Sequence, residues 1–117
     1  MPYSVLAKNA MLNALGALAG FVSLHDDAPG ETGAHELTGG SPAYARKAIT
    51  WNAAAAGVLD DSNQPTFDVP AGASVRYVGL WSAATDGIWY GFDPVTTVNY
   101  IVQSTYTLMD MDLDLNM

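Results

Sequence analysis

The sequence predicts a mainly β fold, an antiparallel β-sandwich of jelly-roll-like form with one N-terminal α-helix. Apolar and polar residues alternate in several short segments separated by Gly, Pro, Asn and Asp, which is typical of antiparallel strands joined by turns. Helical spacing of apolar residues is confined to the first part of the chain. At 117 residues the chain fits one domain, 1–117. Within it we expect a helix over 4–20, the sandwich over 21–108, and an alternating acidic and apolar strand or arm over 109–117.

Composition limits the classes of partner. Half of the residues are hydrophobic and 14% are charged, against about 25% charged in a typical soluble domain, so we expect part of the surface to meet another chain. Twelve acidic residues against four basic ones give a net charge of −8, which argues against nucleic acid and anionic membranes as partners. Because the chain has no cysteine, it has no disulfide, thiolate zinc site or cysteine nucleophile.

The apolar run from Ala10 to Leu24 does not predict a membrane segment. It is short, rich in Ala and interrupted by Asn13, Gly and Ser. Lys8 lies inside the helical pattern rather than in a basic leader, so a signal peptide is not expected either.

The first element is a helix over roughly 5–18, with Ser4 as its N-cap and Gly20 as a natural stop. Its expected apolar stripe consists of Leu6, Met11, Leu15 and Leu18. Such a helix either covers an open end or face of its own β-domain or docks on a neighbouring subunit.

A short strand over Phe21–His25 follows, and then a long connection over 26–42 that is rich in Gly, Asp, Glu, Thr and Pro. Connections of this length in a compact domain are often functional or become ordered against partners. Residues 43–52 are the next strand candidate, with Ile49 and Trp51 facing inward.

Two basic residues of that candidate, Arg46 and Lys47, are close enough in sequence to pair with the acidic connection. Each exposed pair would contribute roughly 0–1 kcal/mol. Residues 53–64 are small or polar and are expected to form a loop.

The segment Thr66–Trp81 is expected to organise the fold as a β-hairpin, because Pro, Ala and Gly at 70–72 separate two alternating stretches. In the second stretch, alternation separates two faces, with Val75, Tyr77, Gly79 and Trp81 on one and Arg76, Val78 and Leu80 on the other.

A further strand is expected over 88–92, ended by Asp and Pro at 93–94. The tail over 96–117 has the longest β pattern, but its alternation slips by one residue at 108–109. Either a bulge lies there or two strands meet. Beyond the slip, Asp alternates with Met and Leu. This acidic row is either a protected edge strand or an arm that pairs with a neighbouring subunit's sheet.

No pattern indicates catalysis. The serines lack a Gly-x-Ser-x-Gly elbow and the glycines lack a Gly-Lys-Ser/Thr continuation, so we expect no enzyme, no cofactor and no small-molecule substrate. Histidines and carboxylates around the connection could coordinate a divalent cation, but their spacing matches no recognised site and no metal is expected. Trp51, Trp81 and Trp89 could line a sugar-binding surface, although core packing is the expected role for most of them.

The connection and the acidic tail are therefore the surfaces expected to bind other subunits. The candidate interface residues are His25, Asp26, Asp27, Glu31, His35, Glu36, Tyr44, Arg46, Lys47, Met109, Asp110, Met111, Asp112, Leu113, Asp114 and Leu115.

Several motifs carry a family resemblance. Residues 23–47 contain a strand ending in Leu-His, a Pro-Gly-x-Thr-Gly-Ala loop and then Gly-Gly-x-Pro-Ala-Tyr-Ala-Arg. Further motifs are Phe-x-Val-Pro-x-Gly at 67–72, Gly-Leu-Trp-Ser-Ala at 79–83, and Ala-Lys-Asn-Ala at 7–10. Together they resemble a group of small tailed-phage virion proteins, common in phages of actinobacteria, that are labelled tail-fibre-like, minor tail or minor capsid proteins. The tail after Leu108 is not part of this resemblance.

The resemblance implies an accessory structural protein of the virion, without catalytic residues, that is assembled in the host cytoplasm. Its expected partners are copies of itself, as a homo-oligomer such as a trimer, and other virion proteins such as the major capsid protein. Small size, an acidic exterior and the lack of a fibre-like repeat favour a capsid-surface decoration protein. The main alternative is a minor tail or tail-fibre-associated protein, and the third is a carbohydrate-binding module that uses Trp89 or Tyr90.

Overall fold

The computed structural model describes residues 3–116 of the chain. One helix precedes the strands in this order: α1 (Val5–Leu18), β1 (Phe21–His25), β2 (Lys47–Ala48), β3 (Val58–Asp60), β4 (Thr66–Val69), β5 (Ser74–Trp81), β6 (Trp89–Asn99), β7 (Ser104–Thr107) and β8 (Asp112–Asp114). The predicted mainly β fold with antiparallel sheets and an N-terminal helix is confirmed. Within 3–116 no helix has the length and apolar character needed to cross a membrane.

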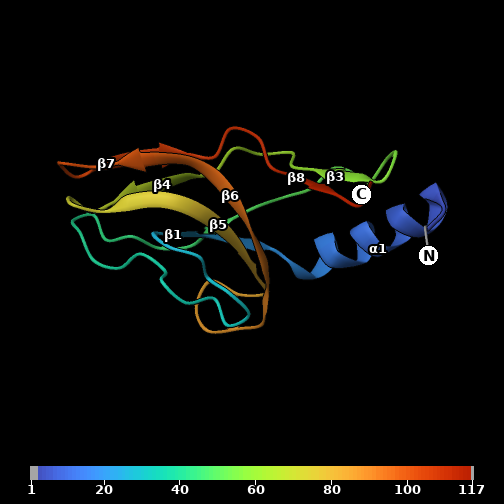
Figure 1. Ribbon diagram of the computed structural model, residues 1–117, viewed down its shortest axis with the longest axis horizontal. Coiled ribbons are helices and arrows are strands. Elements are labelled where there is room, and N and C mark those ends of the chain that lie inside the picture. Colours follow the sequence, from blue (N-terminus) through green and yellow to red (C-terminus); the bar gives the residue numbers. More distant parts are fainter. Residues whose placement is uncertain (1–2, 117) are drawn as a thin grey trace.

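The strands form one larger and two smaller antiparallel sheets. The main sheet has the order β2-β1-β5-β6, while β4 pairs with β7 and β3 pairs with β8. In Figure 1 the β4–β7 pair lies above β1 and β5 as a second layer, and α1 with the β3–β8 pair extends the molecule at one end. The result is an elongated, sandwich-like body with extents of 46 × 26 × 25 Å.

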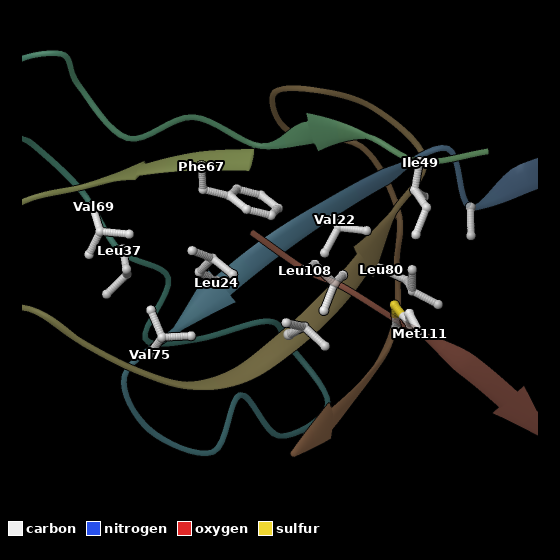
Figure 2. Packing of buried hydrophobic residues seen from close by; sticks show 12 residues of the cluster. Val22, Leu24, Leu37, Ile49, Phe67, Val69, Val75, Leu80, Leu108 and Met111 are labelled. Carbon is white, nitrogen blue, oxygen red and sulfur yellow. The ribbon is translucent and has the colours of Figure 1, made fainter. Parts of the chain in front are cut away.

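The hydrophobic core lies between the main sheet and β4. Figure 2 shows Val22 and Leu24 of β1 and Leu80 of β5 on the side that faces Phe67 and Val69 of β4. All five side chains are buried. Side chains from outside these strands complete the cluster, namely Leu37, Ile49, Leu108 and Met111.

The predicted hairpin over Thr66–Trp81 is wrong in its pairing, although both of its strands exist. β4 pairs with β7, and β5 pairs with β1 and β6, so residues 70–72 carry the chain from one layer to the other. Gly72, at a φ of +82°, donates its N–H to the carbonyl of Tyr100 over 2.7 Å. Alternation defines which face of a strand is apolar, but it does not define the neighbouring strand.

The two faces of β5 also differ from simple alternation. Val75, Val78 and Leu80 are all buried, although alternation places Val75 opposite the other two. The register of β5 against β6 shifts between Val75 and Tyr77. Such an irregularity changes which residues face the core on either side of it.

The bounds of α1 agree with the prediction. Ser4 accepts a hydrogen bond from the N–H of Ala7 at 3.2 Å and so caps the first turn. The helix ends at Leu18, two residues before Gly20, as the sequence indicates.

The face that α1 buries matches the predicted stripe only at Leu15, which is half-buried and packs against the core. Leu12 is 2% exposed, whereas Leu6 is 83% exposed and Met11 and Leu18 also lie outside. Gly16 explains the orientation, because a Cβ there would lie 3.1 Å from Leu59 Cδ2 and 3.3 Å from the Trp51 ring. The glycine therefore lets the helix approach β3 closely on the side that carries Leu12.

Three other expectations are corrected. The strand over 43–52 is reduced to the two residues of β2, and the loop expected over 53–64 contains β3.

β6 continues through Asp and Pro at 93–94 to Asn99. It is an edge strand, which tolerates a proline without an N–H. At 108–109 the chain leaves β7 and continues to β8, so two strands meet there, which is one of the two alternatives that the slip allows.

Candidate assembly surfaces

The connection after β1 folds over the outer face of the main sheet, where His25 holds it. The His25 side chain is fully buried, with Nδ1 2.7 Å from the Ala34 carbonyl and Nε2 2.7 Å from Ser23 Oγ. Burial lowers the pKa of His25 below its usual value, which favours the neutral imidazole. With both ring nitrogens engaged, His25 serves the fold and is not free to bind a metal or another subunit.

Arg46 joins the same connection to the loop after β5. Its guanidinium forms a two-pronged ion pair with Glu36 at 3.0 Å for each contact, and donates to the carbonyls of Ala83 at 3.1 Å and Asp86 at 2.8 Å. It also lies 3.7 Å from the centre of the Trp81 ring. Pairing between Arg46 and the acidic connection is thus confirmed. The arginine side chain is only 9% exposed, so the pair is not the exposed kind that the sequence suggests.

Tyr44 connects this ion pair to β1. Its hydroxyl donates to Glu36 Oε2 at 2.8 Å and accepts from the Leu24 N–H at 2.9 Å. Burial is the largest cause of a raised pKa for Tyr44, so the hydroxyl stays protonated. His25, Glu36, Tyr44 and Arg46 therefore bind within the chain. The exposed candidates of this region are Asp26, Asp27, Glu31 and His35, with Lys47 half-buried.

The acidic tail folds back on its own chain. β8 pairs with β3, with Leu113 opposite Leu59, and Leu113 packs against the core. Met111 is buried, and its N–H donates to Asp61 Oδ1 at 3.1 Å. The strand partner of this arm is therefore β3 of the same chain. The exposed candidates of the tail are Met109, Asp110, Asp112 and Asp114, with Leu115 half-buried.

Three exposed carboxylates meet where β3 and β8 pair. Asp60, Asp110 and Asp112 have oxygens within 4.8 Å of one another. A hydrogen bond with Asp60, followed by partial desolvation and the neighbouring negative charges, raises the pKa of Asp112 to about 6. Each residue brings one oxygen to the cluster, so three ligand atoms converge where Ca²⁺ takes six to eight, and the cluster alone does not define a metal site. The alternation of the tail reveals Asp110 and Asp112, but Asp60 lies in a stretch expected to be a loop.

The three tryptophans lie within the fold, as expected for most of them. Trp51 donates its indole N–H to the Ala19 carbonyl at 3.0 Å, and Trp81 donates to Ser23 Oγ at 2.9 Å. Trp89 donates to the Gly30 carbonyl at 3.1 Å and meets Trp81 edge-on, with ring centres 5.0 Å apart. Each indole N–H is therefore used inside the chain.

Large apolar side chains are exposed on α1, on the turn between β6 and β7, and at separate positions along the body that include Ile88, Phe92 and Met109. Those at the α1 end are Tyr3, Val5, Leu6, Met11 and Leu18. At the opposite end, the turn between β6 and β7 exposes Ile101, at 91%, and Val102 (Figure 1). The sequence does not mark this turn, because the alternation from 100 to 108 predicts an uninterrupted strand there.

These features define a small structural β-domain whose interior polar groups secure its own loops and whose ends expose apolar side chains. A family model described as "Podophage GP4 fiber I protein gp80" matches residues 3–111. The chain belongs to this family, and it is therefore a phage virion component of the fibre type. No curated protein sequence matches the chain.

Proposed function

We propose that this protein is a non-enzymatic structural component associated with the phage tail fibres, and that it works by binding copies of itself and other virion proteins. The family description names a fibre protein, and the matched residues 3–111 include all of the described strands except β8. This favours the tail-fibre alternative over capsid-surface decoration.

The observation that carries the assembly role is the exposure of apolar side chains at both ends of an elongated body. Exposed apolar patches on soluble proteins mark contact sites, because their hydration is unfavourable. Ile101 and Val102 lie at one end, and the apolar residues of α1 lie at the other. A body with contact surfaces at both ends of a 46 Å axis can connect neighbours along that axis.

The absence of catalysis is proposed from the state of the buried polar groups. Of the two histidines, whose side chains are the usual groups for proton transfer near neutral pH, His25 is the buried one, and both of its nitrogens are hydrogen-bonded inside the fold. Glu36 is held by Arg46 and Tyr44. These groups stabilise loops, and none of them lies in an open site with an orienting partner that would activate it.

Carbohydrate binding has less support. Trp89 packs under the connection through the Gly30 carbonyl, so its ring is not an open platform for a sugar.

Localisation on the virion tests this proposal. Antibodies against the protein, labelled with gold and viewed by electron microscopy, should decorate the tail. Quantitative mass spectrometry should find a copy number far below that of the major capsid protein. Labelling over the whole head at a copy number close to that of the capsid protein would support decoration instead and refute the proposal.

A further inference from the structure

The first part of the connection, residues 26–35, lies as a strap over the outer face of the main sheet. Its two ends meet, because the N–H of its first residue donates to the carbonyl of its last residue at 3.1 Å. In between, Gly33, at a φ of +75°, lies against two indole rings. A Cβ added there would lie 2.8 Å from Trp81 Cη2 and 2.9 Å from Trp89 Cε3. The strap therefore covers these two tryptophans.

Few hydrogen bonds join the strap to the sheet. Within residues 3–116 there are two of them. Trp89 donates its indole N–H to the Gly30 carbonyl at 3.1 Å, and the His25 ring meets the Ala34 carbonyl at 2.7 Å. β1, by contrast, pairs with β5 over all five of its residues. A segment held by so few bonds opens at a lower free energy than the sheet beneath it.

The partners of His25 define which of its nitrogens carries a hydrogen. A carbonyl oxygen only accepts, so Nδ1 donates to Ala34. Nε2 of the neutral ring is then an acceptor, and the Ser23 hydroxyl donates to it over 2.7 Å. Ser23 Oγ in turn accepts the Trp81 indole N–H at 2.9 Å. Donors and acceptors match along this row when the ring is neutral.

A proton on Nε2 disrupts the match. Nε2 then becomes a donor directed at the Ser23 hydroxyl, and the hydrogen of that hydroxyl has to turn away. Ser23 and His25 are both fully buried, so the hydroxyl loses its acceptor and the charge of the ring is held away from water. Both costs disappear when the strap opens and water reaches the ring.

The charged groups around His25 compensate that charge only in part. Burial is the largest influence on the pKa of His25 and lowers it, the Ala34 carbonyl, Glu36 and Asp26 raise it, and Arg46 lowers it. Glu36 is already paired with Arg46 at 3.0 Å, and Asp26 is exposed to water. Neither carboxylate is therefore free to serve as a buried counter-ion for the histidine.

The other neighbours of the ring supply no carboxylate. β5 places Tyr77 opposite His25 in register, and the Trp89 ring of β6 lies edge-on with its centre 5.4 Å away. The hydroxyl of Tyr44 is directed to Glu36. A charged His25 is thus best accommodated by hydration.

We propose that the strap is an acid-sensitive cover: a proton that binds Nε2 of His25 releases the strap from the sheet and exposes the rings of Trp81 and Trp89. The backbone favours release, because His35 has a φ of +64°, a conformation that favours glycine and is strained in other residues. Opening relieves this strain and hydrates the charged ring, while β1 remains in the sheet. This conformational change is separate from the fibre-associated role and is tested without the virion.

The direction of the pH dependence follows from the two protonation equilibria. In the open form the His25 ring is in water, where its pKa returns toward the ordinary 6.5, whereas closure lowers that pKa. Above about 6.5 the ring is neutral in both forms. Below it the open form binds the proton more readily, so the open fraction should rise by up to about tenfold for each pH unit. The rise levels off where the closed form is protonated as well.

Hydrogen exchange of the full chain, followed by NMR between about pH 7.5 and about pH 5, tests the proposal. Each rate is divided by the intrinsic rate at the same pH. The Ala34 amide, which donates within the strap, and the Trp89 indole N–H should lose protection by up to about tenfold for each pH unit below about 6.5. The Trp51 indole N–H, bonded to the Ala19 carbonyl outside the strap, is the internal control and should keep its protection.

Two variants assign the effect to one histidine. His25→Asn removes the titrating ring but keeps a side-chain N–H that can donate to the Ala34 carbonyl, so strap protection should no longer depend on pH. His35→Asn is the matched control, because it removes the exposed histidine of the strap and Asn tolerates the left-handed backbone there. This variant should keep the full pH dependence.

An NMR titration of the His25 ring in the natural chain provides a reading that does not depend on the folding of His25→Asn. The ring should titrate below about pH 6.5, and strap protection should level off over the same range. The proposal is overturned if strap protection is constant over this range, or if the pH dependence persists in His25→Asn. Parallel loss of protection in β1 and β5 would also overturn it, because the sheet would then unfold together with the strap.

Discussion

Replacing Arg46 with Met tests whether the long connection is fastened by a buried ion pair. Met keeps much of the apolar stem but removes the guanidinium, which binds both Glu36 oxygens and the carbonyls of Ala83 and Asp86. The exposure of the two partners decides the magnitude. An exposed pair contributes roughly 0–1 kcal/mol, whereas removing one partner of a buried pair costs about 3–5 kcal/mol.

Arg46 is 9% exposed and Glu36 is 21% exposed, so water reaches the carboxylate in part. We therefore expect the lower end of the buried range, about 3 kcal/mol, from Arg46→Met. For a domain of this size that loss lowers the thermal midpoint by about 10 °C. Arg46→Lys should fall between the natural chain and Arg46→Met, because it keeps the charge but not the two-pronged geometry.

Urea unfolding followed by circular dichroism measures the effect on the free energy of unfolding. Lys47→Met removes the neighbouring positive charge and is the control, expected to change stability by about 0.5 kcal/mol or less. A loss below about 1 kcal/mol for Arg46→Met would place the pair in the exposed class and refute the reasoning.

Three further predictions concern close packing and pH. Gly79→Ala should cost about 1–3 kcal/mol in urea unfolding, because a Cβ there would lie 2.6 Å from Trp89 Cη2 and 2.7 Å from Ser23 Oγ. Gly20→Ala, with open space around it, should show no such strain. The lowered pKa of His25 means that the unfolded chain binds a proton more readily, so stability should fall as the pH drops below about 6.5, and His25→Gln should remove that part of the dependence. The pH dependence of stability that comes from Asp112 runs in the opposite direction. The folded pKa of Asp112, about 6, lies above the ordinary value of 3.8, so pairing of β8 with β3 should weaken as the pH rises between these values. Faster amide hydrogen exchange at Leu113 would report this local change, corrected for the intrinsic effect of pH, and Asp112→Asn should abolish it.

Local sequence patterns predict where strands lie better than they predict how strands pair. The alternation of 66–69 and 74–81 is correct for β4 and β5, and Phe21–His25 is correct for β1. The hairpin pairing fails because the turn at 70–72 suits both a hairpin and a change of layer, and only the packing of the two layers decides between them. β3 is missed because its three residues are too few for a period to appear.

The helix illustrates a second limit. Its bounds follow from local signals at Ser4 and Gly20, which act within one turn of the helix. The buried face depends instead on Gly16, where contact with Leu59 and Trp51 requires a missing side chain. Because the inward side of α1 consists of Gly16, the buried Leu12 and the half-buried Leu15, the apolar stripe read from the sequence identifies only Leu15 correctly.

The candidate site shows why a polar connection can be misread as an attachment surface. The groups that hold the connection on the sheet include its own carbonyls, since Gly30 accepts from Trp89 and Ala34 lies beside His25 Nδ1. Main-chain contacts of this kind leave no trace in residue identities. The exposed Asp26 and Asp27 stand out in the sequence, yet Asp26 holds the connection through its backbone N–H to the His35 carbonyl, and the Asp27 carboxylate accepts from the adjacent Ala28 N–H. An attachment surface should therefore be sought among side chains that neither hydration nor packing within the chain gives a reason to expose. Apolar side chains at the two ends of the body meet that condition, because solvation accounts for exposed carboxylates on a connection but not for exposed leucines on a helix whose amides face inward.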